Sequence, residues 1–182
     1  MSDNGNPDEK RPWMSSGPSM YRQPAERLPM DLFSYTREAG HCLRERRFLA
    51  CIAMASTAVE VILNRDRRLK ALPNYKAFDG WAYLNNRTLR LARENGLPID
   101  TLLSTGDDLN GRKPIVFVEL RNKIAHGETA HLVTNLSDYD PSAEQMAADQ
   151  ETKMRSFVSE WFNTAPDVQE GYIRSNRWPD AV

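Results

Sequence analysis

The stretch FLACIAMASTAVEVIL, residues 48–63, constrains the fold most, because it is apolar on nearly every side of a helix. A helix of this kind must be covered on all sides, either by other helices or by lipid. The stretch is shorter than the ~20 apolar residues that a transmembrane helix needs. We therefore expect a buried helix at the centre of a helical bundle.

Other segments have the apolar spacing of amphipathic helices, and no alternating strand pattern persists. We therefore expect an all-α fold, in the form of an up-and-down four-helix bundle with an additional C-terminal helix. Besides 48–63, the expected helices are about a dozen residues from Asp31, then 81–96, 114–126 and about 142–162.

Glycine and proline mark several helix ends. Gly96 and Gly127 each follow a helical pattern, and glycine is the commonest residue just past a helix C-terminus. Pro114 suits the first position of the helix over 114–126, where its missing N–H has no partner in any case.

The composition divides the chain into three parts. Residues 1–30 contain five of the eleven prolines among polar residues, which predicts a disordered N-terminal arm. Residues 31–163 form the expected helical domain, and 164–182 form a polar tail. Because the first residues lack an apolar secretion signal, we expect a cytoplasmic protein without membrane association.

Charge is uneven along the chain, although the formal net charge is −1. Residues 37–123 hold 16 Lys and Arg against 10 Asp and Glu, whereas residues 128–170 hold 2 against 9. A basic helical region can bind a phosphate backbone. Cys42 and Cys51 are expected to be small core residues, since no Cys or His spacing suits a metal. We expect neither a metal nor another cofactor.

The stretch VELRNKIAHGE, residues 118–128, puts a cation, an amide and an imidazole at the end of an apolar helix. Five residues at ~100° each separate Arg121 and His126 by about 140° around the helix axis. They converge on one phosphate only if Arg121 reaches along the helix, if His126 swings out at Gly127, or if a second copy supplies one of them. Alternatively, they are a surface Arg and a His that interacts with the helix dipole.

The string RNKIAHG, residues 121–127, resembles the Arg-x4–6-His signature of HEPN domains. The upstream stretch EAGHCLRERRFLACIAMASTAVEVIL, which contains Glu60, is similar to the first two HEPN helices. The resemblance covers about residues 31–163. It implies a small all-α domain that binds nucleotides or cleaves RNA without a metal, acting as a homodimer.

The resemblance also implies roles for four residues. His126 would transfer a proton, and Arg121 would stabilise charge on the phosphorane. Asn122 would orient His126 or donate a hydrogen bond to phosphate, and Glu60 would hold Arg121 or tune His126. Glu128 stands where a toxin branch of the family, which has a nucleotidyltransferase antitoxin, often has Tyr.

These observations lead us to expect a metal-independent endoribonuclease of HEPN type with a defence, toxin or stress role. It would cleave RNA by attack of the 2′-hydroxyl in a dimeric cleft, and a cognate antitoxin or regulator could bind it. One alternative is a non-catalytic HEPN module that binds nucleotide or RNA. The other is a helical scaffold for dimerisation.

Overall fold

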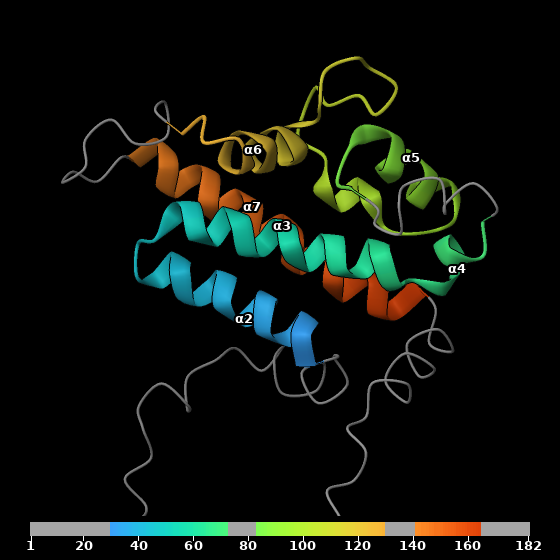
Figure 1. Ribbon diagram of the computed structural model, residues 1–182, viewed down its shortest axis with the longest axis horizontal. Helices are drawn as coiled ribbons and strands as arrows, with labels where there is room; N and C mark the ends of the chain where they lie inside the picture. Colours follow the sequence, from blue (N-terminus) through green and yellow to red (C-terminus); the bar gives the residue numbers. More distant parts are fainter. Residues whose placement is uncertain (1–29, 73–82, 130–140, 165–182) are drawn as a thin grey trace, which may run out of the picture.

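The computed structural model describes residues 30–72, 83–129 and 141–164, and within them the chain is all-helical with no strand (Figure 1). The expected all-α class is therefore confirmed. The expected arm 1–30 and tail 164–182 lie outside the described residues, except for one residue at each boundary. In chain order the helices are α2 (Met30–Arg44), α3 (Phe48–Arg65), α4 (Arg67–Lys70), α5 (Asn86–Glu94), the 3-10 helix η4 (Ile99–Leu102), α6 (Val116–Ala125) and α7 (Pro141–Thr164).

Helix α3 is the central helix, because α2, α6 and α7 all pack against it (Figure 1). By length and composition alone it could cross a membrane, but half of its residues are buried within the protein. Other helices thus cover the apolar residues that lipid would otherwise cover. Its buried residues are Cys51, Ile52, Ala55, Ser56, Ala58, Val59, Val61, Ile62 and Leu63.

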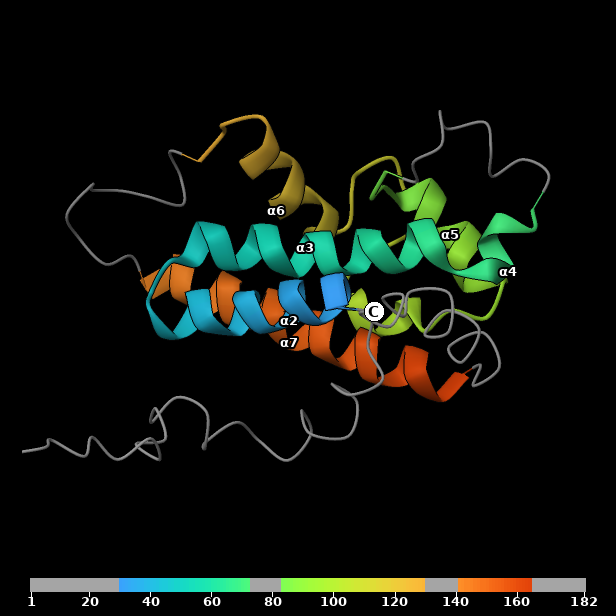
Figure 2. The same ribbon diagram turned by 60° about the horizontal axis from the view of Figure 1, so that its bottom comes forward.

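Helices α3 and α7 lie side by side and run in the same direction. Three contacts follow in the same order along both helices, as Figures 1 and 2 also show. From one end to the other, Cys51 Sγ meets Ala147 O, Gln150 Nε2 donates to Ser56 Oγ, and Trp161 Nε1 donates to the carboxylate just beyond α3, that of Asp66.

The expected helix 142–162 is therefore part of the core rather than an addition to a finished bundle. Phe157 and Trp161 of α7 are buried in the main apolar cluster, together with residues of α2 and α3. Helix α5 lies instead at the end of the molecule near α4 (Figure 1). Hydrophobic periodicity finds both helices, but it does not tell which partner each of them packs against.

A short connection, residues 45–47, reverses the chain between α2 and α3. Arg46 has a positive φ of 59°, although it carries a side chain. The Arg47 N–H donates to Cys42 O and the Arg46 N–H to Leu43 O, the hydrogen-bond pattern of a Schellman motif. Helix α2 thus ends with the same hydrogen bonds as a helix that has glycine at the left-handed position, although Arg46 occupies that position here.

Two expected helix starts were wrong. Helix α5 begins at Asn86, not at residue 81, because the Asn85 side chain accepts a hydrogen bond from Thr88 N and caps the helix there. Helix α6 begins at Val116, so Pro114 is not its first residue. The Val116 N–H at this start is bound by Asp107 Oδ1, which comes from a distant part of the loop.

Asp66 closes the end of the core at which α3 and α7 finish. Its buried carboxylate accepts hydrogen bonds from Arg68 Nε and Nη2 and from Trp161 Nε1. Burial raises the pKa of Asp66, but these hydrogen bonds and the charge of Arg68 outweigh it, so that the pKa is lowered. Arg68 Nη1 also donates to Gly96 O, which ties α5 to the same point.

Candidate functional site

The C-terminus of α6 places His126 at the surface. The Gly127 N–H donates to Ile124 O and the Glu128 N–H to Lys123 O, which completes a Schellman motif with Gly127 at a φ of 73°. His126 is the C-cap residue and its side chain is exposed. The expected stop at Gly127 is confirmed, and it fixes His126 as the last residue before the chain turns away.

Arg121 lies five residues earlier on α6 and faces α3. Its Nη2 lies 2.9 Å from Glu60 Oε1, and the exposed fractions of the two side chains are 26% and 19%. An ion pair that is partly shielded from water is screened less by salt than one on the open surface. The pair thus joins the helix that carries the motif to the central helix.

Two further contacts hold this ion pair in place. The Arg121 Nη1 donates to Asn122 Oδ1 across 3.4 Å, and the backbone N–H of Leu84 donates to Glu60 Oε1, also across 3.4 Å. The guanidinium is therefore held between a carboxylate and an amide oxygen. The carboxylate itself is held by the segment that leads into α5.

The motif residues thus fall into two groups. Arg121 contacts both Glu60 and Asn122, whereas the His126 ring forms no hydrogen bond or ion pair among the described residues. The helical separation of about 140° explains the difference, because Arg121 reaches α3 while the end of the helix faces outward. Within one copy of the chain, the Arg121 and His126 side chains therefore do not contact each other.

A buried polar contact fixes the other side of α6. Gln150 on α7 donates from Nε2 to Phe117 O on α6 and to Ser56 Oγ on α3, so one side chain joins three helices. Sequence reasoning missed both Gln150 and the Leu84 N–H. A glutamine in an otherwise apolar helix stripe is a detectable signal, but a backbone donor carries no sequence signal.

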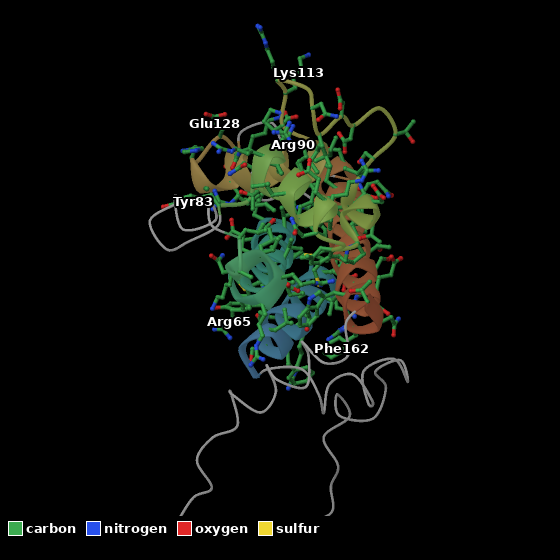
Figure 3. All side chains as sticks on the ribbon, turned by 90° about the vertical axis from the view of Figure 1, so that its right-hand side faces the viewer. Arg65, Tyr83, Arg90, Lys113, Glu128 and Phe162 are labelled. Carbon is green, nitrogen blue, oxygen red and sulfur yellow. The ribbon has the colours of Figure 1, made fainter. Side chains whose placement is uncertain are left out.

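Exposed basic residues lie beyond the N-terminal end of α6. Arg90 on α5 and Lys113 in the loop before α6 lie near the top of the view in Figure 3, and Phe162 lies near the bottom, so these basic residues are on the side of the molecule away from Phe162. The loop is attached to α5 by Asn86, whose side chain donates to Lys113 O and accepts from the Ile115 N–H. Among the described residues, no group of three or more His, Cys, Asp or Glu is placed to hold a metal ion.

These features together can bind a phosphate and exchange a proton. Arg121 presents a fixed cation whose remaining N–H donors can bind anionic oxygens, and His126 presents an accessible imidazole. No family model, curated protein or solved structure matches the chain.

Proposed function

We propose that the chain is a metal-independent endoribonuclease of HEPN type that acts as a homodimer. One observation carries the proposal: Arg121, held by Glu60 and Asn122, lies five residues before an exposed His126 at a glycine-terminated helix end. The proposed bundle consists of α2, α3, α6 and α7, with α4, α5 and η4 as an insertion. A cytoplasmic role in defence, toxicity or stress, with a cognate antitoxin or regulator, belongs to the same proposal.

In the proposed reaction His126 accepts the proton of an RNA 2′-hydroxyl. The 2′-oxygen then forms a bond to the adjacent phosphorus, and the bond from phosphorus to the 5′-oxygen breaks. Arg121 stabilises the negative charge of the crowded phosphorane. The imidazolium that His126 becomes then donates this proton to the leaving 5′-oxygen. The products are a 2′,3′-cyclic phosphate and a 5′-hydroxyl.

The dimer is part of the proposal because the two groups do not meet within one copy. Arg121 is turned toward α3, whereas His126 is exposed at the end of α6. Two copies related by a two-fold axis could place the Arg121 of one beside the His126 of the other. The active site would then form only on dimerisation, which light scattering at micromolar concentration tests: a monomer contradicts this arrangement.

Cleavage of RNA by the purified protein in EDTA is the decisive test. His126→Ala should reduce the rate by ~10²–10⁴-fold, the usual contribution of general acid–base catalysis. His41→Ala is the matched control, since His41 is a partly exposed histidine on α2 that lies 3.2 Å from Glu45 and away from the motif. A substrate with 2′-deoxy at the cut position should bind but not be cleaved. Full activity of His126→Ala would exclude the mechanism.

A non-catalytic module that binds nucleotide or RNA is the second candidate. The observation that favours it is the His126 ring, which no described residue orients by a hydrogen bond. A general base normally has such a partner. Binding of RNA by the wild type without cleavage, together with loss of binding in Arg121→Ala, would support this candidate. In cells, only a nuclease would fragment RNA and arrest growth in a His126-dependent way. A helical scaffold for dimerisation would bind no RNA.

A further inference from the structure

Tyr83 exposes an aromatic ring close to the candidate site. Its side chain is 57% exposed, and the only other large hydrophobic side chain that is exposed among the described residues is Val116, at 39%. In Figure 3, which looks along the longest axis of the molecule, Tyr83 and Glu128 lie on one side and Phe162 lies toward the opposite side. A large exposed aromatic side chain near a cation is a common feature of surfaces that bind unpaired bases.

The backbone connects Tyr83 to the Arg121 ion pair. Leu84, the next residue, donates its N–H to the same Glu60 Oε1 that contacts Arg121 Nη2. From these two contacts and standard bond lengths, the Tyr83 Cα lies within about 9 Å of Arg121 Nη2. The backbone of Tyr83 and the guanidinium of Arg121 are therefore neighbours in space, although they are far apart in sequence.

Hydrogen bonds also hold the backbone from Tyr83 into α5. Asn85 Nδ2 donates to Tyr83 O across 3.0 Å, while Asn85 Oδ1 accepts the Thr88 N–H across 2.9 Å and caps α5. The same residue thus holds the Tyr83 carbonyl and starts a helix. Leu84 is buried and the Tyr83 side chain is exposed, so an accessible ring is attached to a held segment of backbone.

We propose that Tyr83 stacks on an unpaired base of the RNA whose backbone phosphate Arg121 binds. This inference rests on the proposed function and narrows its substrate to single-stranded RNA, because a base within a duplex is not free to stack on a side chain. A guanidinium has five N–H donors, so contacts to Glu60 and Asn122 leave others for phosphate. Tyr83 contributes affinity and position, not proton transfer.

The test uses the full chain and a short single-stranded 2′-O-methyl RNA, which cannot be cleaved by 2′-hydroxyl attack. Tyr83→Ala should weaken binding roughly ten-fold, the usual effect of removing one stacked base contact. Tyr83→Phe and Tyr83→Trp should bind nearly as tightly as the wild type, since both keep an aromatic face. Val116→Ala is the control for loss of an exposed apolar side chain. The affinity for duplex RNA should be lower than for single-stranded RNA, and Tyr83→Ala should not change it.

A second measurement detects stacking directly. Fluorescence of 2-aminopurine placed along the same RNA should be quenched by the wild type and Tyr83→Trp at one position, but not by Tyr83→Ala. Equal binding and equal quenching by Tyr83→Ala and the wild type would overturn the inference while leaving the proposed function intact. If Arg121→Ala and the wild type both fail to bind RNA, the proposed function fails, and this inference fails with it.

Discussion

Arg121 on α6 and Glu60 on α3 form an ion pair with 2.9 Å between Nη2 and Oε1. The contact joins the helix that ends at His126 to the central helix, and Leu84 N–H contacts the same carboxylate oxygen. Substitutions of Glu60 should therefore affect both the stability of the fold and the position of the guanidinium.

Glu60→Gln should be less harmful to stability than Glu60→Ala. Glutamine keeps an oxygen that can accept the Leu84 N–H but removes the charge, which should lower the free energy of unfolding by about 1 kcal/mol. Alanine leaves Arg121 and the Leu84 N–H both without this acceptor, so we expect a loss of about 2 kcal/mol. Urea denaturation measures both values. Equal losses would mean that the Leu84 contact contributes nothing.

Asp66→Asn should destabilise the fold by about 3 kcal/mol at neutral pH, because it disrupts a buried, charged hydrogen-bond group. The pKa of Asp66 is lowered in the fold, so its contribution is fully present above the unfolded pKa of ~3.9 and is lost as the pH falls through the folded pKa. The stability difference between wild type and Asp66→Asn should therefore shrink in acid. Thermal or urea unfolding between pH 7 and strong acid measures it.

Asp100→Asn is the matched control for this acid dependence. Asp100 pairs with Arg93 at 3.0 Å, but the two side chains are 64% and 52% exposed. A pair this open to water contributes little, so the substitution should change the unfolding free energy by less than about 0.5 kcal/mol. A large effect at Asp100, or a constant effect of Asp66→Asn at every pH, would contradict the interpretation.

Two substitutions at residues with left-handed backbone conformation should change the free energy of unfolding in opposite directions. Arg46 has a φ of 59° and Gly127 a φ of 73°. Arg46→Gly should stabilise the fold by about 1 kcal/mol, since glycine adopts this conformation without steric strain. Gly127→Ala should destabilise it by about 1 kcal/mol and shift the end of α6, although nothing lies within 4 Å of the added Cβ. Differential scanning calorimetry compares both with the wild type.

Mixing two inactive variants tests whether the active site is shared between copies. Arg121→Ala and His126→Ala should each be inactive alone. After unfolding and refolding together in equal amounts, random pairing should restore roughly a quarter of wild-type cleavage, because half of the dimers then contain one intact site. No recovery, with mixed dimers demonstrated by differential tagging, would mean that Arg121 and His126 act within one copy.

Sequence alone determined what depends on neighbouring residues. The apolar stretch 48–63 predicted the buried central helix, and Gly96 and Gly127 predicted where α5 and α6 end. The motif residues Arg121 and His126 were also visible, as was their separation around the helix. Each of these features follows from helix periodicity or from the conformation of a single residue. Both causes are local and do not depend on distant parts of the chain.

Tertiary structure alone decided which distant groups meet. Glu60 and Arg121 are 61 positions apart, and their pairing depends on how α6 lies on α3. The start of α6 depends on Asp107, and the position of Tyr83 near Arg121 depends on a backbone N–H that no sequence pattern marks. The left-handed turn at Arg46 also lacks its usual glycine. Long-range packing set each of these features, because the energy of packed helices outweighs the small local preferences of single residues.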